Sequence, residues 1–359
     1  MSDILKRYLK SDLSKQFSSS HDIKIELESL LQLTTANSHP NINPLIELLR
    51  DIPIIKWNLK VHGYLLSKLL YGSTNILNVP VSNELFSPKW SASISKDFFT
   101  SWFRKSCLEL KIEPVLHRKI WELTYVLNNL QHYGFITPDS SGVGFGCGTE
   151  PIPSYLASKG INITATDLEP SNVSAKAWID TAQHISDKEK IWVSDLCTKE
   201  EFNQRVTLRY EDMNNVSSDL DGKFNFCWSI CALEHLGSIE KGLDFIKRSL
   251  DMLKPGGIAI HTTEFNYASD DKTIDNWPTV LFRKKDFLKL QNEILSLGYE
   301  VPEIDFSVGD DPIDWFIDLP PFPWDKGHYS NDLPSDPHLK LSVDGFPCTC
   351  FGIVIRKPF

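Results

Sequence analysis

From residue 142 onward the sequence alternates short apolar runs with helical segments, and this alternation restricts the fold more than any other feature of the chain. Apolar runs that end at glycines or polar turns predict β-strands, and the stretches between them predict helices. Strands separated by helices pair in parallel, so the pattern predicts a doubly wound α/β fold with a mostly parallel, seven-stranded sheet. The predicted strands cover residues 141–145, 163–166, 206–210, 223–229, 257–262, 306–308 and 349–356.

The first 135 residues lack this alternation. Residues 1–85 form a predicted N-terminal helical extension, because apolar residues recur there at intervals of three and four, with a loop rich in Ser, Thr, Asn and Pro at 34–44. Residues 86–135 form a predicted helical cap or lid, and residues 136–359 the α/β domain. The predicted helices of these first two regions include 4–13, 23–31, 54–70 and 115–132.

Phe98, Phe99, Trp102 and Phe103 are expected on one helical face within the cap. An aromatic stripe of this kind either belongs to the core or packs as a lid over a ligand.

Charge and cysteine content argue against several classes of protein. The 359 residues carry a formal net charge of −10, which argues against a partner such as nucleic acid. No apolar run is long enough for a membrane span, and the first residues lack the apolar core of a secretory signal. The seven cysteines are scattered without a zinc-binding spacing, so we expect free thiols, a cytoplasmic location and no metal site.

A glycine-rich loop follows the first predicted strand. Residues 142–151 read GVGFGCGTEP and precede a predicted helix, so the backbone can approach a ligand closely there. Asp167 ends the second predicted strand, where a carboxylate suits the hydroxyls of a ribose. Loop and carboxylate together occur in nicotinamide-dependent and methyl-transferring enzymes alike, and they do not separate the two.

Later motifs make that separation. The third predicted strand ends in Tyr-Glu-Asp-Met at 210–213, the fourth runs into Leu-Glu-His at 233–235, and Leu-Lys-Pro-Gly-Gly at 253–257 precedes the fifth. This succession resembles the class I S-adenosylmethionine-dependent methyltransferases, which implies S-adenosyl-L-methionine as the cofactor. Three further segments, 90–103, 117–122 and 261–266, resemble a group of these enzymes in bacterial-type surface-polysaccharide pathways.

The resemblance implies a role for each matching residue. Gly146 and Gly148 border the methionine end of the cofactor, and Asp167 accepts hydrogen bonds from the ribose. Asp212 receives the adenine amino group with Met213 against the ring.

Ser229 is expected under the cofactor at the end of the fourth strand.

Two positions depart from the family pattern. Gly144 stands where an acidic residue is usual, and Glu150 stands where the last glycine is usual. Glu150 either supplies the missing carboxylate or caps the following helix.

Methyl transfer to a hydroxyl needs positioning and a base, because the sulfonium is already a good leaving group. His235 follows the fourth predicted strand and Glu264 follows the fifth, so both lie on the rim where an acceptor docks. His261 lies on the fifth strand itself and is either a further candidate or a hydrogen-bonded core residue. Thr181, Gln183 and His184 form either a polar helix end or an acceptor-binding edge.

The sequence therefore predicts transfer of a methyl group to a hydroxyl of a sugar, glycan or other small molecule. The alternatives are a methyltransferase acting on nucleic acid or protein, a non-catalytic cofactor-binding module, and a nicotinamide-dependent reductase. The motifs from 210 to 257 do not resemble the last of these. A homo-oligomer through the N-terminal helices is also expected.

Overall fold

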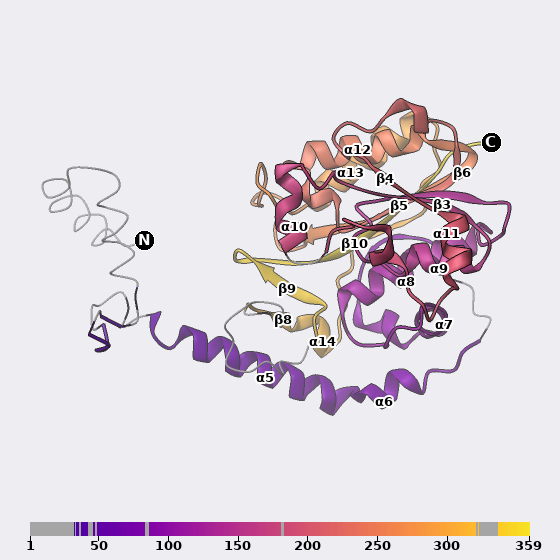
Figure 1. Cartoon of the computed structure of the whole chain (residues 1–359). Coiled ribbons are helices and arrows are strands. Elements are labelled where there is room, and N and C mark those ends of the chain that lie inside the picture. Colours follow the sequence, from indigo (N-terminus) through magenta and orange to yellow (C-terminus); the bar gives the residue numbers. More distant parts are fainter. Residues whose placement is uncertain are drawn as a thin grey trace, which may run out of the picture. The chain divides into compact units, whose positions relative to one another are not determined.

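The computed structural model describes residues 32, 34–35, 37–41, 46, 49–82, 86–180, 183–320, 322 and 337–359 (Figure 1). The chain divides into a unit of residues 1–61 and a unit of residues 62–359, and α5 (Ile52–Leu70) runs across this border. The helices expected at 4–13 and 23–31 lie outside the described residues. No helix among the described residues has the length and apolar character needed to cross a membrane.

A ten-stranded sheet organises residues 62–359. Eight of its strands follow the order β4-β3-β2-β5-β6-β10-β1-β7, in which β4, β3, β2, β5 and β6 are parallel neighbours and β10 is antiparallel to β6. This order confirms the doubly wound α/β fold class. The strands are β1 (Trp90–Ala92), β2 (Ser141–Phe145), β3 (Asn162–Asp167), β4 (Val206–Tyr210), β5 (Phe224–Ile230), β6 (Leu253–Asn266), β7 (Ile304–Asp305), β8 (Ile317–Asp318), β9 (Lys340–Val343) and β10 (Phe346–Arg356).

Helices cover both faces of the sheet, as a doubly wound fold requires. On one side lie α8, α9 and α11, and on the other lie α12 and α13 (Figure 1). The helices of this unit are α6 (Gly72–Leu77), α7 (Ser101–Leu110), α8 (Arg118–His132), α9 (Ile152–Ser158), α10 (Lys176–Asp180), α11 (Lys199–Arg205), α12 (Ile239–Asp251), α13 (Lys284–Ser296) and α14 (Pro312–Trp315).

The segment expected as a separate helical cap, 86–135, contributes a strand to the sheet. Ser91 of β1 pairs antiparallel with Gly352 of β10 and parallel with Asp305 of β7. This insertion, together with β8 and β9, expands the sheet beyond the seven strands expected from the sequence. The strand expected at 306–308 is instead the short β7 at Ile304–Asp305.

The aromatic stripe of this segment also differs from its expected form, because Phe98 and Phe99 lie in a 3₁₀ turn, Ser95–Phe99, before α7 begins. Phe98 and Phe103 are buried in the core, which supports the core interpretation of these two residues.

Two glycines of β2 make room for two aromatic residues of the neighbouring strand β5. Gly142 pairs with Phe226 and Gly144 with Trp228, and a Cβ atom on either glycine would lie within 2.3 Å of the facing ring. Both rings are buried, and such close approach is available only to glycine. Packing against Trp228 therefore accounts for glycine at position 144.

Candidate active site

The glycine loop lies where the sheet reverses its strand order, because β3 follows β2 on one side and β5 adjoins it on the other. Ligands of doubly wound folds bind at this switch point, beyond the carboxyl ends of the strands. Gly146 and Gly148 have φ angles of +58° and +53°, which favour glycine. A Cβ atom at Gly148 would lie 2.6 Å from the carbonyl oxygen of Gln183, so this segment covers the loop closely.

Asp167 ends β3 beside the glycine loop. Its Oδ1 accepts a hydrogen bond from the backbone N–H of Leu168 at 2.8 Å, and its Oδ2 accepts one from Ile185 at 3.0 Å. Each carboxylate oxygen has a second lone pair with which to accept another hydrogen bond. His184 lies 3.7 Å from the same carboxylate. Gln183 and His184 thus lie beside Asp167 and the glycine loop, while Thr181 lies outside the described residues.

The residues that follow β4 lie beside Asp167 and the glycine loop. The backbone N–H of Glu211 donates to the carbonyl oxygen of Asp167 at 2.9 Å, which fixes the following turn beside β3. The sulfur of Met213 lies 3.7 Å from the position that a Cβ at Gly146 would take. Asp212 accepts a hydrogen bond from the backbone N–H of Asn214 at 2.8 Å. The structure therefore places Gly146, Asp167 and Met213 around one region.

Ser229 and His261 form a hydrogen-bonded pair inside the core. The Ser249 hydroxyl donates to the Ile246 carbonyl, so its oxygen accepts from His261 Nε2 at 3.0 Å. His261 Nδ1 then accepts from the Ser229 hydroxyl at 2.8 Å. Burial lowers the pKa of His261 to about 3. Because both ring nitrogens are used and the side chain is buried, His261 is a core residue and not a rim base, and the Ser229 hydroxyl faces His261 instead of a ligand.

Glu150 reaches toward the sheet from the end of the glycine loop. Its Oε2 accepts a hydrogen bond from Trp228 Nε1 at 3.1 Å. The following helix, α9, has Pro151 as its N-cap and receives no side-chain capping bond within the described chain. No hydrogen bond from Glu150 to α9 occurs among the described residues, and the favourable effect of its negative charge at the start of this helix stays a prediction. Desolvation raises the pKa of Glu150 well above its usual range.

His235 lies just beyond β5, as expected. Its Nδ1 lies 3.0 Å from the Pro278 carbonyl oxygen, which can only accept, so Nδ1 carries the proton and Nε2 holds a free lone pair. Nε2 lies 3.9 Å from Glu234 Oε1, and the ring contacts Trp178 with centroids 4.4 Å apart. Desolvation lowers the pKa of His235 to about 4, so the ring is neutral at physiological pH.

A buried group of charged residues lies beneath this rim. Glu264 lies on β6, two residues after Thr262, which pairs with Ile230 at the end of β5. The Oε1 atom of Glu264 lies 2.5 Å from Arg118 Nη1. Arg118 is also 3.6 Å from Glu122, one turn along α8. Removing one partner of an ion pair this deep is costly, because the other charge is left buried without compensation.

Glu122 joins α8 to the ends of two strands. Its Oε2 accepts from the Thr262 hydroxyl at 2.6 Å and from the Cys231 thiol at 2.8 Å. Cys231 directly follows β5 with a φ of +46°, a strained conformation for a residue with a side chain and one that clusters at functional sites. Glu234 is held by the Thr263 hydroxyl at 2.9 Å.

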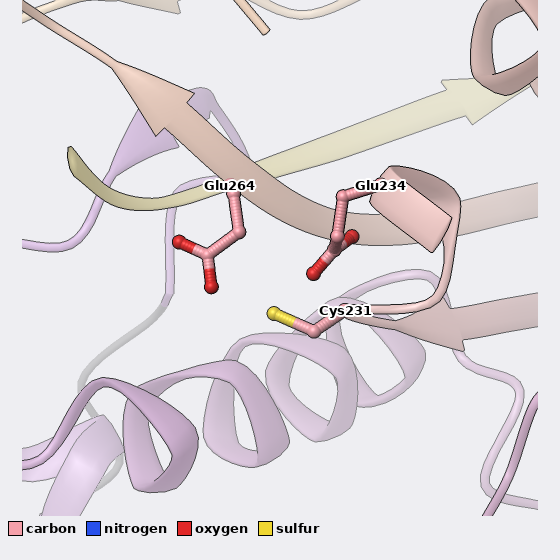
Figure 2. A group of neighbouring side chains, drawn as sticks. All are labelled: Cys231, Glu234 and Glu264. Atoms are coloured by element: carbon pink, nitrogen blue, oxygen red, sulfur yellow. The ribbon is translucent and has the colours of Figure 1, made fainter. Parts of the chain in front are cut away.

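Three potential ligand atoms meet at this point. Figure 2 shows the Cys231 thiol and the carboxylates of Glu234 and Glu264 turned toward one another, with their ligand atoms within 4.8 Å. The Arg118 guanidinium is 2.5 Å from Glu264 and 3.5 Å from Cys231. Arg118 is therefore the counter-ion of Glu264 in this cluster.

The sequence did not single out Arg118, Glu122, Cys231 or Glu234 as site residues. One usable signal was present: Arg118 and Glu122 are spaced i,i+4 on a predicted helix, which places two opposite charges on one face.

Comparison with known proteins finds a family match over much of the same region. Residues 124–293 match a protein-family model described as "Methyltransferase domain". A search of the curated proteins finds no match.

Solved structures with a similar arrangement include a SAM-dependent methyltransferase from Methanosarcina mazei, with 16% identity and a TM-score of 0.37 over 63% of this chain and 96% of the other. Another is the Burkholderia thailandensis 1,6-didemethyltoxoflavin-N1-methyltransferase with bound S-adenosylhomocysteine, with 14% identity and a TM-score of 0.35 over 64% of this chain and 76% of the other.

The matched segment runs from α8 through β2, the glycine loop and β6 into α13, and so contains most of the residues described above. The sheet order and this match lead to one conclusion: the chain is an enzyme with a methyltransferase domain of the Rossmann-like, class I fold.

Proposed function

We propose that this protein transfers a methyl group from S-adenosylmethionine to a hydroxyl of a sugar, glycan or other small molecule. S-adenosylmethionine is the methyl donor of this fold, and it supplies the electrophilic methyl carbon when bound. Gly146, Gly148, Asp167, Asp212 and Met213 are the residues that would hold it. The acceptor docks over the ends of β5 and β6.

One observation carries the assignment of the base. Among the described residues no hydrogen bond occupies the Nε2 lone pair of His235, which lies 3.9 Å from Glu234 Oε1. An acceptor hydroxyl placed beside Nε2 can donate its one proton to this lone pair. His235 then takes the proton that the hydroxyl loses as its oxygen attacks the methyl carbon. Glu264 contributes through its ion pair with Arg118, which also lies near the buried carboxylate of Glu122 below the acceptor.

The test uses S-adenosylmethionine with an isotope-labelled methyl group and a panel of sugars, sugar nucleotides and glycans. Mass spectrometry is expected to find the labelled methyl on a hydroxyl oxygen. Calorimetry that shows binding of NAD and none of S-adenosylmethionine or S-adenosylhomocysteine would overturn the proposal.

Asp167→Ala is expected to weaken S-adenosylhomocysteine binding by about 1.5–3 kcal/mol, the scale of a hydrogen bond to a charged group. Calorimetry measures the dissociation constant. Asp139→Ala is the matched control, because Asp139 is exposed and precedes β2 at the opposite edge of the sheet. The melting temperature of the free variant shows whether the loop at Ile185 is retained. A loss below about 0.5 kcal/mol would remove Asp167 from the ribose site.

Other expectations from the sequence stay proposals. A role in surface-polysaccharide biosynthesis and a cytoplasmic location follow from the sequence resemblance and the free thiols. Self-association through N-terminal helices is supported by apolar side chains that α5 exposes, among them Leu65 and Leu69. Sedimentation of the full-length chain and of a Leu65→Ser, Leu69→Ser variant tests it.

A further inference from the structure

One sulfur atom and two carboxylates lie together at the carboxyl ends of β5 and β6. Cys231 directly follows β5, Glu234 lies in the 3₁₀ turn Leu233–His235, and Glu264 lies on β6. Their potential ligand atoms are within 4.8 Å of one another (Figure 2). Both carboxylates are buried, whereas Cys231 is partly accessible, so an ion can reach the group from the rim.

These atoms form a donor set that suits zinc. In a tetrahedral zinc site, a thiolate sulfur and carboxylate oxygens lie about 3.5 Å apart. Zinc would therefore draw the ligand atoms from at most 4.8 Å to about 3.5 Å. Magnesium and calcium prefer oxygen ligands, whereas thiolate sulfur selects zinc among the common divalent ions. Three protein ligands leave a fourth position open for water.

Glu122 gives an independent indication of a missing ion or water. Its side chain is completely buried, and Oε2 accepts from the Cys231 thiol at 2.8 Å, so this carboxylate is turned toward the ligand atoms. Oε1 has no hydrogen-bond partner in the described part of the chain, since Arg118 Nη1 and Lys119 Nζ are each 3.6 Å away. A buried oxygen without a donor is rare and indicates an ion or water nearby. A water molecule bound to the metal would supply this donor.

The charges of the group also favour a divalent cation. Its carboxylates belong to Glu122, Glu234 and Glu264, and its cations to Arg118 and Lys119. Glu234 is buried and forms no ion pair with a lysine or arginine among the described residues. A buried carboxylate without a partner is costly. Once the thiol loses its proton, four negative side chains face two positive ones, and the difference equals the charge of Zn²⁺.

We propose that Cys231, Glu234 and Glu264 bind a zinc ion at the carboxyl ends of β5 and β6. The Cys231 thiol loses its proton to solvent as the bond from sulfur to zinc forms, and nothing is oxidised or reduced. This site goes beyond the proposed function and does not depend on it. It also differs from the expectation drawn from cysteine spacing, because a site with a single thiol leaves no repeated spacing in the sequence.

Calorimetry with zinc chloride tests the site in protein first stripped of metal by a chelator. One zinc ion is expected to bind per chain with release of about one proton, which titrations in buffers of different ionisation enthalpy measure. Loss of a residue that only supports a ligand costs about 10- to 100-fold in metal affinity, so loss of a ligand should cost at least about 100-fold. Cys231→Ser and Glu234→Gln are each expected to weaken zinc binding by that factor, and Cys231→Ser to abolish the proton release.

Cobalt gives a spectroscopic measurement of the same ligands. Co²⁺ bound in place of Zn²⁺ is expected to show the near-ultraviolet charge-transfer band of a thiolate ligand, together with the visible bands of a tetrahedral ion. Cys231→Ser should lose the charge-transfer band. Cys197→Ser and Glu200→Gln are matched controls, because Cys197 is a buried thiol just before α11 and Glu200 is exposed on that helix. Neither control should change the zinc affinity or the cobalt spectrum.

Circular dichroism and the thermal transition show whether each variant is folded, and the cobalt spectrum of the unaltered protein decides the question if a variant is not. Three results would overturn the inference: no zinc binding by the unaltered protein, unchanged zinc affinity in both Cys231→Ser and Glu234→Gln, or a cobalt spectrum without the charge-transfer band.

Discussion

His235→Ala is expected to lower kcat by at least about a hundredfold, because a positioned base contributes roughly 10²–10⁴-fold to proton removal from a hydroxyl. Affinity for S-adenosylhomocysteine should change little, since the imidazole lies on the acceptor side of the site. Steady-state kinetics with labelled cofactor and calorimetry measure the two quantities. His132→Ala is the matched control: its Nδ1 also lies 2.9 Å from a backbone carbonyl, that of Phe86, but it lies at the end of α8.

The pH profile tests the state of the same imidazole. The base acts only when neutral, and desolvation lowers the pKa of His235 to about 4. The rate should therefore be flat from about pH 5.5 to 7.5 and fall as the pH drops toward 4, instead of rising through the ordinary histidine pKa of about 6.5. A rise centred near that ordinary value would show that His235 is solvated in the active enzyme. A near-wild-type kcat in both His235→Ala and Glu264→Gln would remove both residues from the reaction.

Arg118→Met is expected to lower the free energy of unfolding by about 3–5 kcal/mol, because it leaves the Glu264 carboxylate buried without its counter-ion. Arg118 Nη1 lies 2.5 Å from Glu264 Oε1, and both side chains are nearly inaccessible to water. Denaturant unfolding of the free protein measures the change.

The double variant Arg118→Met, Glu264→Met should recover a large part of the loss, because it removes both charges together. Lys289→Met is a matched control, because its ion pair with Glu240 is exposed and such pairs contribute about 0–1 kcal/mol. If the single-variant losses simply added in the double variant, Arg118 and Glu264 would not be coupled and the ion pair would not hold the cluster together.

Much of the sheet was predictable from local patterns. The bounds of β2 and β4 agree with those expected from the sequence, and the glycine loop and Asp167 lie at the ends of the expected strands. Strands and turns of this kind are encoded by neighbouring residues, through apolar periodicity and the backbone freedom of glycine. The order of the motifs along the chain was sufficient to indicate the fold class.

Other features depended on residues far apart in the sequence. The insertion of β1 between β10 and β7 rests on the pairing of Ser91 with Gly352, which no local pattern specifies. His261 has the same residue type as His235, yet its hydrogen bonds to Ser229 and Ser249 make it part of the core. Likewise, the hydrogen bond that Glu150 accepts from the Trp228 indole joins residues 78 positions apart, and no local pattern specifies it.

The sequence by itself determined the strands, the glycine loop and the carboxylate at the end of β3, because backbone preference and apolar periodicity act over a few residues. Only the tertiary structure brought Arg118 of α8 to Glu264 of β6 and Glu122 to Cys231. Such contacts depend on sheet register and helix packing, which the whole chain sets together, and they decide which polar side chains lie buried in ion pairs and which remain open to a ligand.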